Sequence, residues 1–435
     1  MRSRAPHRDL RGFTLIEVLV ALSAGVLVSM AAFMLSKDAT RFFQHEARIS
    51  SAQMALTLAM NRLTGDIQRA GFLSSANVLL DPTVCRQTST SWTPGLNALA
   101  GINIAASTQS TPQSLAQVPS LTPDQIIIGG SMDSSEVYQV QCVLSGAGGA
   151  PLLVMRAPTN EPATCRANAS LGPSDTLAGN LTPLVYPSTY PTASLASGRF
   201  ARIYHPDTNF QWFGVISTFT IDGTGTLNVQ LAALPTIPAK PANTCGIALG
   251  DCGGGWLFSV VSRVKYDIRS LQGGSYASSQ YAPVVAAVSP QVTGDSGRTE
   301  LVRTELAADG SELSTATELV AEYAVDLRFG ITVSTKITGD NYNPTVTTYP
   351  IGNSSVYSIA ASIQSSGTPE LIRAVQVRLA TRTRAPDRDA SLPVQAADGR
   401  RLRFLIDPTM QPAYARMRTL YANVALPNQG GFSLW

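Results

Sequence analysis

One acidic residue lies inside a long apolar segment near the start of the chain. Glu17 is the single charged side chain in the 23 residues 13–35, FTLIEVLVALSAGVLVSMAAFML. An ionised carboxylate at the centre of a bilayer costs roughly 3 kcal/mol on insertion scales, and somewhat less near the interface. Because this position is costly for a charge, we expect Glu17 to have a function and an oppositely charged partner.

The spacing of Glu17 from the preceding residues indicates which partner this is. If the chain is cut between Gly12 and Phe13, the new α-amine at Phe13 lies one helical turn from Glu17, and an α-amine is protonated at neutral pH. In an assembly of parallel helices, Glu17 can pair with the amine of a neighbouring subunit. Two buried charges that each lack a partner in the isolated chain then favour packing in one register.

The apolar segment has the length of a membrane span. As a helix, residues 13–35 extend about 34 Å, and the hydrocarbon core of a bilayer is about 30 Å thick. The preceding leader, residues 1–12, contains four arginines and one aspartate, so the positive-inside rule keeps it cytoplasmic. Everything after Leu35 is then expected in the periplasm or its equivalent.

Two plainer interpretations of this segment are a secretory signal peptide and a signal anchor. A signal peptide has a small-residue cleavage site after its apolar core, whereas this core continues into KDATRFFQHEARISS without a clear A-x-A site. A signal anchor has no use for Glu17.

Residues 11–22, RGFTLIEVLVAL, resemble the class III signal sequence of type IV pilins and type II secretion pseudopilins. In that family a membrane peptidase cuts after the glycine and methylates the new N-terminal residue. The resemblance implies that Gly12 precedes the cut, that Phe13 becomes N-methylated, and that Glu17 is the fifth mature residue and acts in assembly.

Helical patterning continues beyond the membrane segment. Residues 36–71 contain one apolar stripe with spacings of three and four, made of Ile49, Ala52, Leu56, Ala59, Leu63 and Ile67. Polar residues, Asp66 among them, are assigned to the other faces, and Gly71 is a candidate stop signal. The pattern predicts one helix over 13–70 whose second half packs on the domain's own sheet.

The remainder, residues 72–435, has the pattern of a β-rich periplasmic head, which makes the fold α+β: a long N-terminal helix against antiparallel sheet. Strands are expected at 125–128, 137–144, 152–156, 200–204, 212–221, 227–231, 256–268, 301–306, 325–333, 372–383 and 414–426. Residues 315–323 are a candidate short helix, and helices are otherwise expected to be absent between strands. Residues 81–124, 158–198 and 334–368 are rich in small and polar residues and are predicted to be loop insertions.

Four segments of the C-terminal half refine the resemblance. Residues 298–306, 318–333, 371–387 and 414–428 follow in the order found in W-type minor pilins (PilW) and the related J-type minor pseudopilin, although VALPN stands where that family has VALRN. The resemblance implies a non-enzymatic minor pilin that helps prime pilus assembly at the tip, with a J-type pseudopilin as the alternative. The implied partners are prepilin peptidase, other minor pilins, the major pilin, the inner-membrane assembly platform and a large tip adhesin. The implied location is the inner membrane and then the surface pilus.

The five cysteines all follow residue 80, and their expected periplasmic location favours disulfides. Cys245 and Cys252 lie seven positions apart in a glycine-rich stretch, which predicts a small disulfide loop. If a second bond forms among Cys85, Cys142 and Cys165, one thiol is left over.

Enzymatic, metal and nucleic-acid functions have weak support. Of the three histidines, only His205 is a candidate for a catalytic set in an anchored periplasmic enzyme, which is the alternative of another class, and no G-x-S-x-G elbow accompanies it. Asp340, Asn341 and Asn343 lack the EF-hand spacing. A net charge of +3 is too small to indicate nucleic acid. No cofactor and no metal site are expected.

Overall fold

The computed structural model describes residues 14–79, 81–85, 92–106, 123–132, 137–155, 198–221, 227–233, 246–247, 249–252, 255–271, 298–335, 345–365, 368–386, 401–407 and 413–429. The chain divides into two compact units, residues 1–53 and residues 54–435, which we call the stalk unit and the head unit. The leader, Gly12 and Phe13 lie outside the described residues, as do Cys165, Cys245 and residues 340–343.

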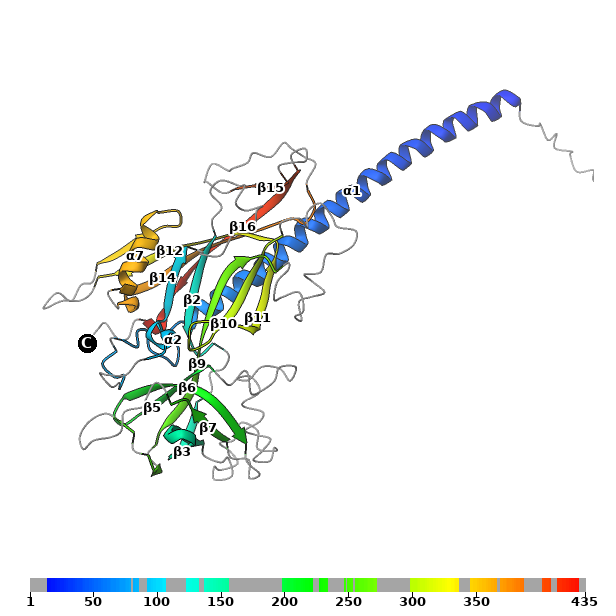
Figure 1. The fold of residues 1–435 in the computed structure, drawn as a ribbon. Coiled ribbons are helices and arrows are strands. Elements are labelled where there is room, and N and C mark those ends of the chain that lie inside the picture. The colour runs from blue at the N-terminus through cyan, green and yellow to red at the C-terminus, as the bar shows by residue number, and fades with distance from the viewer. Residues whose placement is uncertain are drawn as a thin grey trace, which may run out of the picture. The chain divides into compact units, whose positions relative to one another are not determined.

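A single helix, α1, spans Leu15–Gln68 and contributes to both units (Figure 1). Its 54 residues confirm the long helix that the apolar patterning predicts. The chain turns after Gln68 and passes through Gly71 with a φ of 74°, a left-handed conformation that favours glycine. The predicted stop at Gly71 therefore lies within three residues of the observed end of α1.

Among the described residues, the first sheet of the head unit has eleven strands, and the pairings between these strands are antiparallel. Its main path runs β1-β2-β9-β5-β6-β7-β4-β3-β8, while β10 pairs with β9 and β11 with β10. The strands are β1 (Ile102–Ala106), β2 (Asp124–Gly130), β3 (Tyr138–Ser145), β4 (Pro151–Met155), β5 (Phe200–His205), β6 (Phe210–Ile221), β7 (Leu227–Leu231), β8 (Asp251–Cys252), β9 (Leu257–Arg269), β10 (Glu300–Leu306) and β11 (Glu312–Glu322). Strand β9 joins two parts of this sheet, because its first half pairs with β5 and its second half pairs with β10.

The second sheet has five antiparallel strands in the order β13-β12-β14-β16-β15. The strands are β12 (Ala324–Ser334), β13 (Val346–Tyr349), β14 (Ile372–Arg382), β15 (Arg403–Asp407) and β16 (Ala413–Ala425). Two further α-helices are described, α2 (Pro94–Asn97) and α7 (Ser355–Ser365), together with the short 3-10 turns Ala147–Gly149, Pro369–Leu371 and Pro427–Gln429. The α+β fold class is confirmed.

The larger hydrophobic core lies between the last part of α1, both sheets and α7. Within the head unit, the predicted stripe residues Leu56, Ala59, Leu63 and Ile67 are all buried in this core. A second core fills the part of the first sheet around β5, β6 and β7, with Trp212 and Phe258 fully buried. The part of α1 that follows Met54 is thus an integral part of the head.

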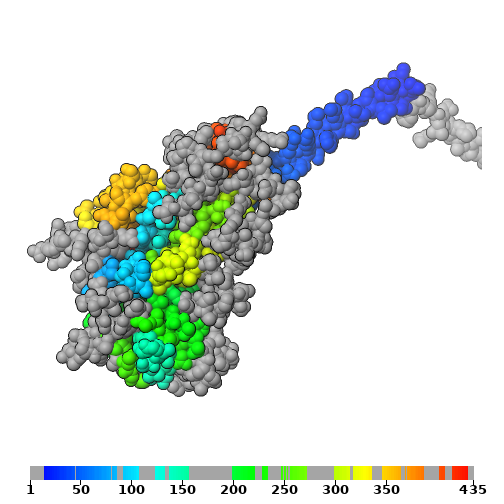
Figure 2. Space-filling model, in the orientation of Figure 1, coloured from blue at the N-terminus to red at the C-terminus, as the bar shows by residue number. Residues whose placement is uncertain are grey.

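Three expectations about secondary structure are wrong. The candidate helix 315–323 is instead part of strand β11 as far as Glu322, because this segment pairs along β10 and the ladder overrides a weak helical pattern. The predicted loop 81–124 contains α2 and β1, and the predicted loop 334–368 contains β13 and α7. Helix α7 follows from Val356, Ala360 and Ile363, a short buried stripe among polar residues, and it forms part of the head surface (Figure 2).

The cysteine pairing also differs from the expectation. Cys142 forms a disulfide with Cys252, so the predicted bond between Cys245 and Cys252 is wrong. The cause is strand register, since β3 and β8 pair with these two residues directly opposite each other. Cys85, which is buried, is also disulfide-bonded.

Candidate functional site

Helix α1 begins with a reciprocal side-chain cap. The Glu17 Oε2 atom accepts hydrogen bonds from the backbone N–H of Thr14 at 2.9 Å and from its hydroxyl at 3.0 Å. In return, the Glu17 N–H donates to Thr14 Oγ1 at 3.3 Å. This is a capping box, and it satisfies backbone donors that the first helical turn leaves unpaired. The sequence signal for it is the T-x-x-E spacing, which the apolar run around it obscures.

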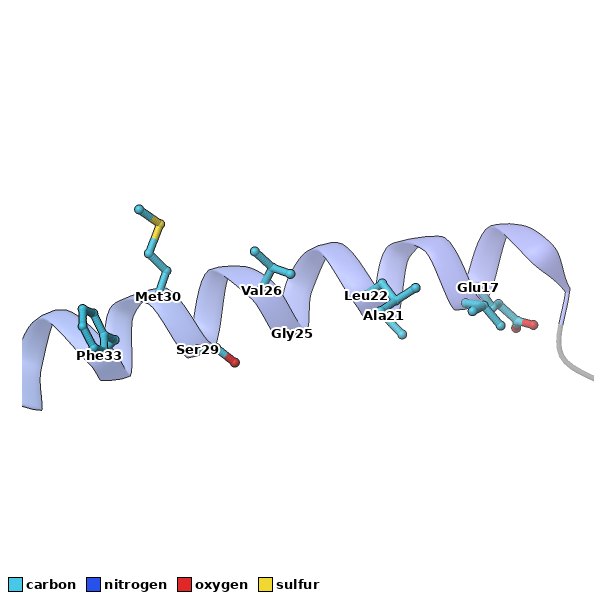
Figure 3. A pocket seen from close by; sticks show the side chains of 9 residues that line it. Glu17, Ala21, Leu22, Gly25, Val26, Ser29, Met30 and Phe33 are labelled. Carbon is cyan, nitrogen blue, oxygen red and sulfur yellow. The ribbon is translucent and has the colours of Figure 1, made fainter.

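Glu17 also lies at one end of a face of α1 that is lined by small residues. Ala21, Gly25 and Ser29 follow it at intervals of four, so they lie on one side of the helix (Figure 3). A Cβ added at Gly25 would meet no atom within 4 Å. Such a face lets the backbone of another apolar helix approach closely.

The apolar side chains around this face are open to the surroundings. Leu15 is 81 % exposed, Leu27 69 % and Phe33 70 %, and the first part of α1 lies open to the surroundings (Figure 2). In the part of the chain that the structure describes, α1 is the one helix long and apolar enough to cross a membrane. An exposed apolar surface of this extent marks contact with a membrane or with other proteins.

The predicted pairing of Glu17 with an amine at Phe13 stays a prediction, because Phe13 lies outside the described residues. What the structure adds is that the Glu17 carboxylate already has a partner in its own chain. Any amine that binds it must compete with, or share, the contacts from Thr14.

The comparison with protein families concerns this same segment. A family model described as the prokaryotic N-terminal methylation motif matches residues 8–33. The chain carries this motif. It is the motif of type IV pilins and pseudopilins, and with the exposed apolar helix it indicates a prepilin-like protein anchored in the inner membrane, processed by prepilin peptidase. No curated protein and no solved structure matches the chain.

In the head unit, a buried polar cluster fastens α1 to the first sheet. Asp66 of α1 is 2 % exposed, and its Oδ2 atom accepts hydrogen bonds from Tyr266 Oη at 2.7 Å and Arg303 Nε at 2.8 Å. Burial, and then the neighbouring Asp66 carboxylate, raise the pKa of Tyr266 well above its usual value, so its hydroxyl stays a donor. The sequence of α1 assigns Asp66 to a polar face, because nothing in α1 alone reveals the buried arginine opposite.

The end of α1 is held by the C-terminal segment of the chain. Asn428, within the VALPN stretch, donates from Nδ2 to the carbonyl of Gln68 at 3.1 Å. This bond satisfies one of the carbonyls that the last helical turn leaves unpaired. The asparagine of the motif that suggested a minor pilin thus contacts the helix that carries the methylation motif.

A second buried carboxylate, Asp124, joins the two sheets and α7. It accepts hydrogen bonds from Tyr357 Oη at 2.6 Å, from an Arg328 guanidinium nitrogen at 3.2 Å and from the Phe329 N–H at 3.1 Å. Burial raises the pKa of Asp124 to about 6, although these three donors favour the ionised form. Since Asp124 is fully buried and its contacts are structural, we assign it to stability.

His205, the candidate catalytic histidine, ends strand β5 beside a turn. Its ring packs edge-on against Trp256 with 4.4 Å between ring centroids, and its Nδ1 atom accepts a hydrogen bond from the Thr208 N–H at 3.4 Å. Within the described ranges, no group of three or more histidine, cysteine or acidic residues is arranged to hold a metal ion.

Proposed function

We propose that the chain is a minor pilin, a structural subunit that helps prime assembly of a type IV pilus and lies at its tip. The observation that carries this proposal is the methylation motif on a helix whose small-residue face and apolar surface are exposed. The C-terminal resemblance to W-type minor pilins supports the choice of pilus over secretion system.

The proposed organisation has four parts. Residues 1–12 are the leader, 13–35 the membrane and filament-core helix, 36–71 the amphipathic helix, and 72–435 the periplasmic head. Prepilin peptidase cuts between Gly12 and Phe13 and methylates Phe13. The implied partners are the other minor pilins, the major pilin, the inner-membrane assembly platform and a large tip adhesin.

In this proposal Glu17 changes partner during assembly. Before the cut, its carboxylate is held by Thr14 at the start of the helix. The cut creates a positive α-amine one helical turn before Glu17. The corresponding amine of a neighbouring subunit can then bind the same carboxylate. The small side chains of Ala21, Gly25 and Ser29 then allow the two helices to pack closely along the same face.

The test is the pair of variants Glu17→Ala and Ser23→Ala in the native host. Ser23 is a matched control, because its hydroxyl only bonds the Val20 carbonyl within its own helix. We expect both variants to be cleaved, Glu17→Ala to be absent from sheared surface filaments and to reduce piliation, and Ser23→Ala to behave as wild type. Piliation is measured by electron microscopy and the chain by immunoblotting.

Normal piliation with Glu17→Ala would contradict the role of Glu17. A deletion strain that keeps its pili but stops exporting secreted enzymes would favour the J-type pseudopilin instead. Retention of residues 1–12 in the cell would favour an anchored periplasmic protein.

A further inference from the structure

Arg263 is a buried cation whose charge no described residue balances. It lies on β9 and is 4 % exposed, and its Nε atom is buried without a hydrogen-bond partner. Its neighbours along the same face of β9 are different, because Lys265 pairs with Glu312 and Arg269 contacts Asp267 at 2.7 Å. Among these basic residues of β9, Arg263 is therefore the one that no described acidic residue contacts.

The charge on Arg263 persists despite burial. Burial lowers its pKa to about 10, which still leaves the guanidinium protonated at neutral pH. Removing an unpaired charge from water is unfavourable, whereas pairing it with an anion recovers much of that loss. An arginine in this position therefore has a strong tendency to bind an anion.

A second unpartnered polar group lies beside Arg263. Thr304 of β10 is fully buried, and its hydroxyl has no hydrogen-bond partner. The register pairs Arg263 with Leu306 and Lys265 with Thr304, so Thr304 is the diagonal neighbour of Arg263 on the same face. On the other side, Arg263 faces Gly129 of β2, which has no side chain to offer.

We propose that Arg263 and Thr304 form a binding site for a small oxyanion of the carboxylate or phosphate class. The planar guanidinium donates two parallel hydrogen bonds to such an anion, and the threonine hydroxyl donates a third. Arg263 is only 4 % exposed, which leaves no room for an acidic side chain of another protein, so the proposed occupant is a small free ion. Binding stabilises the head, because the anion binds the folded state and not the unfolded chain.

The test measures the thermal midpoint of the full chain in detergent with increasing acetate or inorganic phosphate, against chloride at matched ionic strength. We expect a saturable rise in the midpoint for the wild type with acetate or phosphate and none for Arg263→Met. Thr304→Val, which loses one hydrogen bond to a charged group, is expected to bind about tenfold more weakly. Arg202→Met is the matched control, because Arg202 is a half-buried arginine whose Nε already donates to Gln211 at 2.7 Å, and it should keep the response.

Two results would overturn the proposal. A wild type that does not respond to acetate or phosphate has no such site. An equal response in wild type and Arg263→Met would indicate an adventitious ion only. If Arg263→Met fails to fold, Thr304→Val decides in its place, and an unchanged affinity in that variant counts against the site.

Discussion

At the scale of single residues, Asp124 makes the stability of the head depend on pH. Its folded-state pKa is about 6, against 3.8 for an unperturbed aspartate, so the folded state binds its proton more tightly than the unfolded chain. The contribution of Asp124 to the free energy of unfolding is therefore fully present below about pH 4 and is lost as the pH rises through 6. A difference of about two pKa units between the folded and unfolded states corresponds to roughly 3 kcal/mol in the free energy of unfolding.

The variant Asp124→Asn isolates this contribution. Asparagine keeps an oxygen that accepts from Tyr357 or Phe329 but does not titrate. We expect the unfolding free energy of the wild type, relative to the variant, to fall between about pH 4 and about pH 7 by an amount on the order of 3 kcal/mol. Urea unfolding at several pH values measures it. Parallel profiles for the two proteins would show that Asp124 does not titrate in this range.

The residues that matter at the start of α1 were largely predictable from the sequence. A carboxylate in an apolar run is rare, which identifies Glu17 as a candidate functional residue. The T-x-x-E spacing indicates its contact with Thr14. Asp66, Arg263 and Asp124 were not predictable, since each owes its role to residues that lie far away in the chain. A single strand or helix does not indicate which of its polar residues the neighbouring element will bury.

At the scale of elements, the last part of α1 is expected to contribute strongly to the stability of the head. Leu63 is fully buried in the main core, whereas Leu58, on the same helix, is 63 % exposed. We expect Leu63→Ala to lower the free energy of unfolding by about 2–5 kcal/mol, because it leaves a cavity. Leu58→Ala, the matched control, should change it by less than about 0.5 kcal/mol.

Denaturant unfolding of the two purified variants in detergent checks this expectation. Equal effects of Leu63→Ala and Leu58→Ala would mean that α1 is not an integral part of the head core.

Element types were predictable where one periodicity continued long enough. The stripe of α1 and the alternating runs of β2, β5, β9 and β14 gave the right elements within a few residues. The misassigned segment β11 has mixed patterning and acquires its strand conformation from β10. The pairing of Cys142 with Cys252 follows from the register of β3 and β8, and sequence spacing contains no information about it.

At the scale of the whole molecule, the two units differ in how they bury apolar surface. The head unit buries most of its large apolar residues in its own cores. The stalk unit has its apolar side chains exposed along the helix from Leu15 to Leu35. An exposed apolar surface of this extent indicates contact with a membrane or with other apolar helices, and our proposal places the chain in these two environments in turn.

The most direct test of this account is to identify the N-terminal residue of the chain recovered from sheared surface filaments. Intact mass spectrometry combined with mapping of the first peptide identifies both the cut and the methyl group. We predict a chain that begins at Phe13, carries one methyl group on its α-amine, and is found with other pilus subunits. A chain that keeps residues 1–12 and remains in the membrane fraction of piliated cells would contradict the account.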